Sequence, residues 1–409
     1  MPTTQFDLMD GRLYVPGVPH EEFAYLRKHE PVSLRSDPRG GPDYWAVTTY
    51  EECVTVNREW TSFSSHERSA LIVEPSPGEL ATQQLMMLNM DPPLHTRYRR
   101  LVNKGFTPRM VKDLEVSIHQ ATDRILDRVC EQGEADFVTA VSAELPLEVI
   151  ADLLGVPAED RHRMFDWSNR MIGAEDPEYG ESEDGNAQAA MELYAYASAL
   201  YEQKRVDPRA DLMSVLTDVE VEGEKLTDLE LELFFLLLTV AGNETTRNLM
   251  SGAMHTFFEH PDQWERLVAD RSLLPTAIEE MLRFVSPVMD FRRQAMTDVE
   301  MRGQQIRAGD KVIFFHVSAN RDEDIFEDPD VFDIARQPNP HIAFGGGGPH
   351  FCLGANLARM EARVMFEHLL DRMPDIHAAG PVQRLQSPFI NGVKHLPVAF
   401  AASAPVNPV

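Results

Sequence analysis

Cysteine, positive charge and long apolar runs are all scarce in this sequence of 409 residues. The three cysteines, Cys53, Cys130 and Cys352, lie far apart, so neither a zinc ribbon nor a disulfide framework is expected. The longest apolar run, Leu233 to Leu238, has six residues. A helix that spans a bilayer needs about 20 residues.

The charge balance excludes further classes. Against 66 Asp and Glu there are 38 Lys and Arg, a net charge of −28, which disfavours binding to nucleic acid and to anionic membranes. The first residues, MPTTQFDLMD, lack the basic flank and apolar core of a signal peptide. The sequence therefore predicts an acidic protein of the cytoplasm that binds neither membrane nor nucleic acid.

The patterns along the chain predict a mostly helical protein with minor strands. Thr227 and Glu230 form a capping box that starts a long helix, which Pro261 ends near His260. This helix would be roughly 50 Å long, and its apolar centre places it through the core. Further helices are predicted over 51–59, 111–129, 146–154, 187–204, 277–284 and 355–373, strands over 44–50 and 311–315, and irregular segments over 173–185 and 320–340.

The segment Phe344-Gly-Gly-Gly-Gly-Pro-His-Phe-Cys352-Leu-Gly354 precedes the last of these helices. Its glycines allow a tight turn with inward amides, and a cysteine at a helix N-terminus is favoured as thiolate. These features indicate a thiolate that binds a metal, whose other ligands would come from a macrocycle. A phosphate loop is disfavoured because no Gly-Lys-Ser/Thr follows. A buried structural cysteine is the remaining alternative.

Three weaker features accompany this loop. Ala241 to Thr246 form a polar island in the long helix, with Gly242 expected to thin the face that Ala241 and Thr245 share, although an ordinary polar face would look similar. Glu280 and Arg283 are three residues apart on a helix, as in many surface ion pairs. The segment 95–112 holds a basic island without Asp or Glu, which could bind an anion or reflect chance clustering.

In order and spacing, these features resemble those of bacterial cytochrome P450s, the haem-thiolate monooxygenases, over nearly the whole chain. The glycine loop is similar to the family's haem-binding loop, with one residue more between Phe344 and Cys352, a variant associated with sterol, terpenoid and branched-lipid hydroxylases. The resemblance implies a mostly α fold, a triangular helical prism around a buried haem b with a small β lobe. One domain would span 1–409, with strands mainly within 1–60, 285–320 and 380–400 and helices within 90–285 and 354–373.

The resemblance also implies roles for single residues. Cys352 would be the proximal iron ligand, and the oxygen-activation motif matches Ala241, Gly242, Glu244 and Thr245, with Glu in place of the more frequent Asp. The motif's acid and alcohol would carry protons to oxygen. Further haem contacts would come from His95, Arg99, Arg293, Phe344, His350 and Gly354, and a buried ion network from Glu280, Arg283 and Arg336.

Substrate contacts are expected from regions that face the haem in the family. The side chains there are nearly all apolar, although each could equally belong to the core. They are Leu85, Met86, Met87, Leu88, Met171, Ile172, Val240, Ala241, Val288, Met289, Phe291, Phe389 and Ile390.

The implied reaction inserts one oxygen atom from O2 into a C–H bond of an apolar molecule such as a steroid, terpenoid, branched lipid or macrolide-like metabolite. Electrons would come from NAD(P)H through a reductase and a small acidic ferredoxin. The ferredoxin would dock on the Cys352 side of a monomeric enzyme, steered by Arg97, Arg100, Lys104 and Lys112. A peroxygenase and a non-catalytic haem sensor or recruitment platform are alternatives, and the Glu244–Thr245 pair disfavours both.

Overall fold

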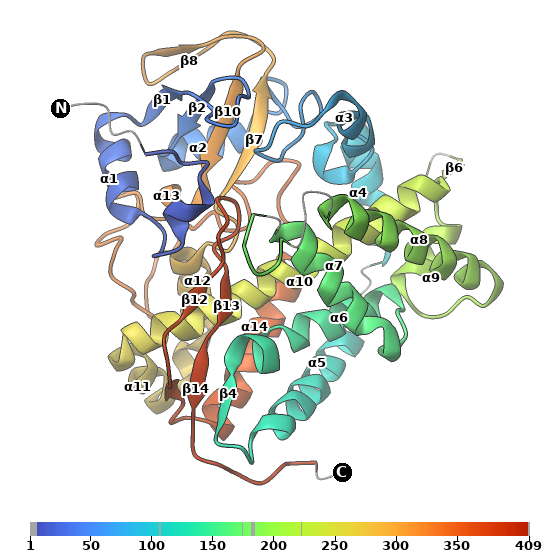
Figure 1. Ribbon diagram of the computed structural model, residues 1–409, viewed down its shortest axis with the longest axis vertical. Helices are drawn as coiled ribbons and strands as arrows, with labels where there is room; N and C mark the ends of the chain where they lie inside the picture. The colour runs from blue at the N-terminus through green and yellow to red at the C-terminus, as the bar shows by residue number, and fades with distance from the viewer. Residues whose placement is uncertain (1–5, 106–107, 174, 181–184, 222, 408–409) are drawn as a thin grey trace.

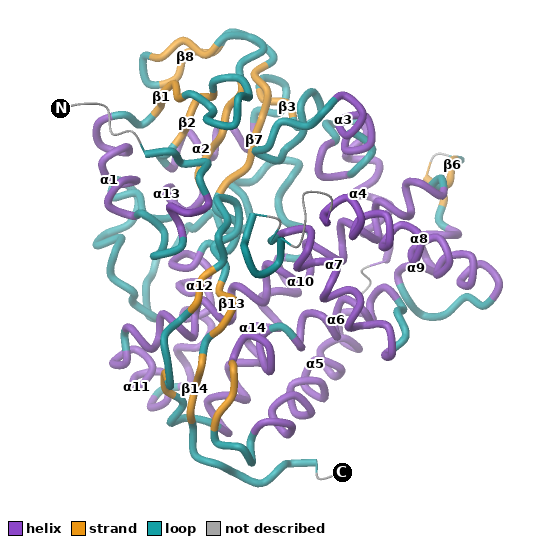
Figure 2. Tube along the Cα trace, in the orientation of Figure 1, coloured by secondary structure: helices purple, strands orange, loops and turns teal. Residues whose placement is uncertain are grey.

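The computed structural model describes residues 6–407 except 106–107, 174, 181–184 and 222. Helices dominate it, and the main sheet lies in a smaller lobe that holds the N-terminal segment, while shorter strands lie beside the helices elsewhere (Figures 1 and 2). The helices are α1 His20–His29, α2 Tyr50–Arg58, α3 Pro77–Gln83, α4 Leu94–Gly105, α5 Pro108–Val129, α6 Glu144–Leu154, α7 Arg161–Ile172, α8 Gly185–Val206, α9 Leu212–Asp218, α10 Asp228–Glu259, α11 Pro261–Ala269, α12 Leu274–Val285, α13 His316–Ala319 and α14 Ala355–Arg372.

Helix α10 runs through the middle of the helical part, as its apolar sequence predicts (Figure 1). The capping box is present, since the Glu230 amide donates to Thr227 Oγ1 at 3.3 Å and the Thr227 amide donates to Glu230 Oε2 at 2.7 Å. Pro261 begins α11, so α10 ends at Glu259. Helices α6, α8 and α12 pack against it. The two halves of α10 therefore face different parts of the molecule.

The main sheet joins two distant parts of the chain. Its strand order is β1-β2-β10-β7-β3, with β10 parallel to β2 and antiparallel to β7. The strands are β1 Val32–Arg35, β2 Tyr44–Val47, β3 Phe63–Ser64, β4 Glu134–Asp136, β5 Glu220–Val221, β6 Glu224–Lys225, β7 Asp290–Ala295, β8 Val299–Met301, β9 Gln304–Ile306, β10 Lys311–Phe315, β11 His377–Ala378, β12 Gln383–Arg384, β13 Val393–His395 and β14 Pro397–Ala399.

The predicted helices and the two predicted strands are present, with ends shifted by a few residues. Most strands of the described residues lie within the ranges predicted to hold them, whereas β3 and β11 lie outside these ranges and β4, β5 and β6 lie inside the helical range. Each of these strands has only two or three residues, too few to show a period-two pattern. Among the described residues, no helix is long and apolar enough to cross a membrane.

Candidate functional site

Cys352 lies between the glycine loop and the start of α14. Its amide donates to the carbonyl of Phe344 at 2.9 Å, which closes the loop on itself. Burial raises the pKa of the thiol, while the Gly354 amide and the charges of Arg99 and Arg359 act in the opposite direction. A coordinated metal ion deprotonates a thiol, and the amide and the two cations would then stabilise the thiolate.

The glycines of this loop are required by the backbone and by α2. Gly345, Gly347 and Gly348 have φ angles of +94°, +95° and +78°, which favour glycine. A Cβ on Gly348 would lie 2.6 Å from the carbonyl oxygen of Asn57. Arg58 Nε donates to the Gly346 carbonyl at 2.7 Å and fixes the loop against α2. Gly346 and Gly348 therefore have no room for a side chain against α2.

Basic side chains from three parts of the chain meet beside this loop. His95 on α4 and Arg293 on β7 are buried, and the His95 ring lies 4.3 Å from the His350 ring. Arg99 Nη1 reaches the carbonyl of Pro349 at 3.5 Å. Burial lowers the pKa of Arg293 to about 10, and burial together with Arg99 lowers that of His95 to about 4.

Within the described residues, no carboxylate forms an ion pair with Arg99 or Arg293. The Nη1 of Arg293 donates only to the neighbouring carbonyl of Arg292, at 2.6 Å. Cations are rarely buried without a partner. This cluster therefore fits a group that brings its own negative charge, and the two carboxylates of haem meet that need.

The middle of α10 supplies an open face. Ala241 is exposed, and Val240 and Thr245 are half-buried, although α10 is the central helix. The role predicted for Gly242 is wrong, because this residue faces α6. A Cβ on Gly242 would lie 2.9 Å from Ile150 Cδ1. Gly242 permits close approach of α6 to α10, and does not thin the face that Ala241 and Thr245 share.

Thr245 and Glu244 have different surroundings. Thr245 Oγ1 donates to the Ala241 carbonyl at 2.7 Å and lies half-buried. Glu244 is buried and accepts from Arg247, whose Nη1 donates to Asn169 of α7 at 2.7 Å. Burial raises the pKa of Glu244, and Arg247 opposes that rise. The second oxygen of Glu244, Oε1, has no hydrogen-bond partner.

Glu280 forms ion pairs with both Arg283 and Arg336, as predicted. Arg283 donates to both oxygens of Glu280, at 2.7 and 2.8 Å, and Arg336 Nε donates to Oε1 at 3.1 Å. The Asp333 amide and Asn339 Nδ2 also donate to Glu280, both at 3.1 Å. This network organises the irregular segment 320–340, which the sequence left without secondary structure.

The predicted substrate residues divide by burial. Met86, Leu88, Met171, Ile172, Val240, Val288, Phe291 and Phe389 are half-buried, whereas Leu85 and Ala241 are exposed and Met87 and Ile390 are buried. The prediction of a substrate contact is wrong for Met289, because its side chain is fully buried in a core cluster with Phe23, Leu26 and Ile313. The rings of Phe291 and Phe389 lie 5.6 Å apart.

Only part of the basic island lies within the described residues. Arg100 is exposed on α4 and Arg97 is half-buried. The side chains of Lys104 and Lys112 lie outside the described residues. A docking role for the island stays a prediction.

Several contacts at the site were not predicted. Arg359 lies 4.6 Å over the Phe344 ring and donates to both oxygens of Glu279, at 2.6 and 2.9 Å. Arg58 holds the glycine loop, and Arg247 holds Glu244. Only Arg247 had a signal in the sequence, because it is three residues from Glu244.

Comparisons with known proteins agree with this geometry. The family model for cytochrome P450 matches residues 186–373. A steroid C26-monooxygenase of Mycolicibacterium smegmatis is 41% identical, covering 98% of this chain and 96% of its own. A methyl-branched lipid omega-hydroxylase of Mycobacterium bovis is also 41% identical, over 93% of this chain and 90% of its own.

Solved structures give the same result. A Mycobacterium marinum cytochrome P450 in complex with pseudoionone has a TM-score of 0.90 at 37% identity and covers 98% of this chain and 99% of its own. A Bacillus megaterium enzyme in complex with corticosterone has a TM-score of 0.82 at 37% identity, over 94% and 98%. The chain belongs to the bacterial cytochrome P450 family, and it is a haem-dependent monooxygenase that hydroxylates apolar substrates.

Proposed function

We propose that this enzyme hydroxylates a steroid or a methyl-branched lipid. The observation that carries this proposal is the identity of 41% to relatives named for these two substrate classes, over at least 93% of the chain. The apolar, partly aromatic side chains Phe291, Phe389 and Val240 support it, because such linings suit large apolar ligands. The adaptable methionines Met86 and Met171 suit a branched chain.

We propose haem b as the cofactor, with Cys352 as its thiolate ligand. His95, Arg99, Arg293 and His350 would bind the propionates, because these groups gather without a paired carboxylate. Bound haem would supply the activation of dioxygen, which is the source of the oxygen atom inserted into the substrate. The protein orients the substrate and excludes water, and Thr245 would hold a proton at Oγ1 beside the open face of α10.

Cys352→His tests the ligand. The red-shifted Soret band of the reduced carbon monoxide complex should be lost while haem content is retained. Retention of that band would place the ligand elsewhere.

Extraction with acidified acetone tests the cofactor. It should release unmodified haem b, and a pigment that stays with the protein would contradict haem b.

A spectral binding screen tests the substrate class. Cholesterol represents the steroids and phytanic acid the methyl-branched lipids, and palmitic acid, which is neither, is the control. Displacement of iron-bound water by a fitting ligand shifts the Soret band. Tighter binding of cholesterol or of phytanic acid than of palmitic acid supports the proposal. Binding of both no tighter than that of palmitic acid contradicts it.

We propose a small acidic ferredoxin as the electron donor, reduced by NAD(P)H through its reductase. The exposed Arg100, in a chain of net charge −28, supports directed docking near Cys352. Arg100→Glu should slow stopped-flow reduction several-fold, and the difference should shrink as salt rises, since the screening length is about 8 Å at physiological ionic strength. Reduction rates that change with neither charge reversal nor salt would contradict this docking site.

The cytoplasmic location, the monomeric state and the extent of the single domain stay predictions.

A further inference from the structure

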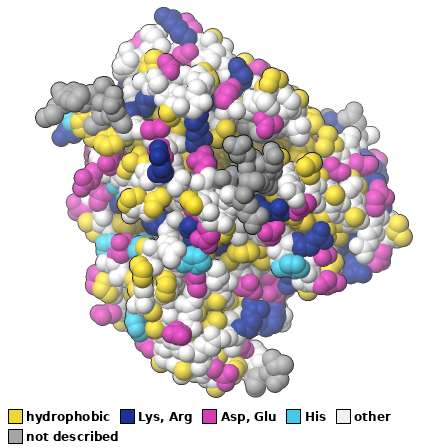
Figure 3. Space-filling view, in the orientation of Figure 1, with side chains coloured by type: hydrophobic (Ala, Val, Ile, Leu, Met, Phe, Trp, Pro, Cys, Tyr) yellow, Lys and Arg dark blue, Asp and Glu magenta, His cyan; other side chains and the backbone are white. Residues whose placement is uncertain are grey.

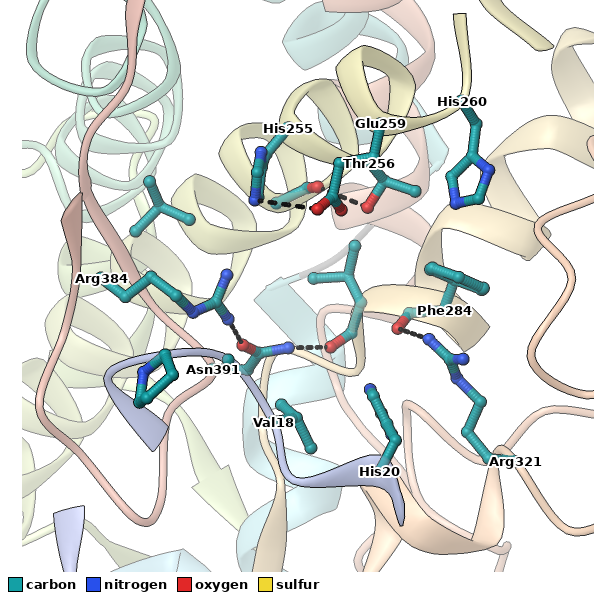
Figure 4. A pocket seen from close by; sticks show the side chains of 15 residues that line it. Val18, His20, His255, Thr256, Glu259, His260, Phe284, Arg321, Arg384 and Asn391 are labelled. Atoms are coloured by element: carbon teal, nitrogen blue, oxygen red, sulfur yellow. Dashed lines mark hydrogen bonds and ion pairs between the residues drawn. The ribbon is translucent and has the colours of Figure 1, made fainter. Parts of the chain in front are cut away.

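A cavity lies beside the C-terminal half of α10. Its volume is about 430 Å³, and its walls come from the N-terminal segment, from α10, from the end of α12 and from the chain around β12 and β13 (Figure 4). Its lining residues include none of those assigned above to haem or substrate. The cavity is therefore separate from the candidate haem site, and nothing in the proposed function uses it.

Arg384 enters this cavity from one side. It donates to the side-chain oxygen of Asn391, and its Nε has no hydrogen-bond partner (Figure 4). Within the described residues no carboxylate forms an ion pair with it. Burial lowers the pKa of Arg384, with Glu259 opposing the shift at longer range. Arg384 is half-buried, and a guanidinium with a buried, unpaired Nε and one neutral acceptor can bind an anion.

Further donors approach from the other side of the cavity. Arg321, only 4% exposed, donates to the Phe284 carbonyl at 3.4 Å, and its Nε has no partner. The Nδ1 of His20 is also buried without a partner. Figure 4 places Arg321 and His20 across the cavity from Arg384. The unsatisfied groups on both sides can thus serve a single ligand.

Two carboxylates, Glu259 in the cavity wall and Asp330 beside Arg321, offset the positive charge of the cavity only in part. Asp330 pairs with Arg321 Nη1 at 2.9 Å, and its side chain is 66% exposed. Glu259 lies 3.9 Å from His255, and its side chain is 60% exposed. Solvent screens charges this exposed, so they offset buried cations weakly.

We propose that this cavity binds a small organic anion. Its carboxylate would accept from Arg384 and from His20, and its short apolar part would pack on Val18, Phe284 and Val285. A volume of about 430 Å³ suits an organic acid better than a bare inorganic ion, which would leave the apolar wall without contacts.

Isothermal titration of the holoprotein tests this site with three probes. Hexanoate carries both features, hexan-1-ol lacks the charge, and inorganic phosphate lacks the apolar part. Hexanoate should bind about tenfold or more tightly than either of the others, because charge-assisted hydrogen bonds and apolar contacts act together. Equal affinities for hexanoate and hexan-1-ol, or no binding of hexanoate, would overturn the proposal.

Two variants assign the binding to this cavity. Arg384→Gln should weaken hexanoate binding about tenfold or more by removing the charge. Val18→Phe should weaken it similarly by filling the cavity, and it leaves every charged group in place, so it decides the matter if Arg384→Gln folds poorly. The matched control is Arg209→Gln, whose arginine is 67% exposed and is not one of the lining residues, and this variant should bind hexanoate as the wild type does. Unchanged affinity in Val18→Phe would show that hexanoate binds elsewhere, for example beside the haem, and would overturn the assignment.

Discussion

Glu280 and Glu244 have the same local sequence pattern and different surroundings. Each is a buried glutamate that pairs with an arginine three residues later on its own helix, with side-chain exposures of 0% and 1%. Both oxygens of Glu280 accept hydrogen bonds, from two arginines, one asparagine and one backbone amide. Glu244 accepts from Arg247 alone, and its Oε1 has no partner.

The hydrogen-bond network of Glu280 is therefore complete, whereas that of Glu244 is not. A buried polar network stabilises a fold when every member is satisfied, and an unsatisfied member is costly. The region of Glu244 contains more such members, because both amide atoms of Asn243 and the hydroxyl of Thr239 also lack partners. Incomplete pairing beside the open face of α10 is expected of a region that handles protons or a ligand.

Glu280→Gln should give the largest loss of stability. Both carboxylate oxygens accept hydrogen bonds, so the new NH2 group must face a donor whichever way the amide turns. Breaking a buried ion pair costs about 3–5 kcal/mol. The measurement is chemical denaturation of the holoprotein, together with the yield of soluble holoprotein.

The neighbouring residue provides a matched control for that variant. Glu279 pairs with Arg359, and both side chains are 32% exposed. Burial opposes the shift, but hydrogen bonds from Arg359 and His341 lower the pKa of Glu279 to about 2. Because solvent screens this pair, Glu279→Gln should cost about 1 kcal/mol or less. Both oxygens of Glu279 also accept hydrogen bonds, so equal losses from the two variants would show that burial does not set the cost of breaking these pairs.

Glu244→Gln should cost less than Glu280→Gln, although Glu244 is as deeply buried. The amide oxygen can still accept from Arg247, and the NH2 group can occupy the place of Oε1, which has no partner to lose. We expect a loss of about 2 kcal/mol, the usual size for a hydrogen bond to a charged group, because Arg247 keeps an acceptor and loses its ionised partner. The same denaturation experiment measures it. A loss as large as that of Glu280→Gln would remove the distinction between the two sites.

These two sites also show what could be predicted from the sequence. The ends of α10 follow from the capping box and Pro261, which are local signals, and the glycine loop marks Cys352 by composition. The partners that distinguish Glu280 from Glu244 come from afar. The Asp333 amide and the Asn339 side chain lie 53 and 59 residues from Glu280. No spacing pattern marks contacts at such separation, so only the folded chain shows them.

His395 provides a smaller, pH-dependent effect in a more exposed carboxylate cluster. Its ring contacts Asp136 at 2.5 Å and Glu178 at 2.9 Å, which ties the segment after α7 to β13. Burial opposes the shift, but these two carboxylates raise the pKa of His395. Its stabilisation should therefore be complete below the unfolded pKa of about 6.5 and be lost as pH rises through the folded pKa.

The variant His395→Gln isolates this contribution. The side chain is 31% exposed, so after allowance for solvent screening the wild type should exceed the variant by less than about 1 kcal/mol at low pH. The difference should shrink towards pH 9, and denaturation curves at several pH values measure it. A difference that grows with pH would contradict the assigned sign of the shift.

Thr245→Ala should have the smallest effect on stability and a distinct effect on the reaction. The hydroxyl is half-buried and donates only to the Ala241 carbonyl of its own helix, so its removal leaves no buried side-chain group unpaired. We expect a change in unfolding free energy within about 0.5 kcal/mol and unchanged haem content. If Thr245 holds the proton that the reaction needs, NAD(P)H consumption should continue while product falls and hydrogen peroxide rises. The measurement is the ratio of product formed to NAD(P)H consumed, with a ligand from the spectral screen as substrate. A ratio equal to that of the wild type would remove Thr245 from proton delivery. The open face of α10 would then only bind substrate.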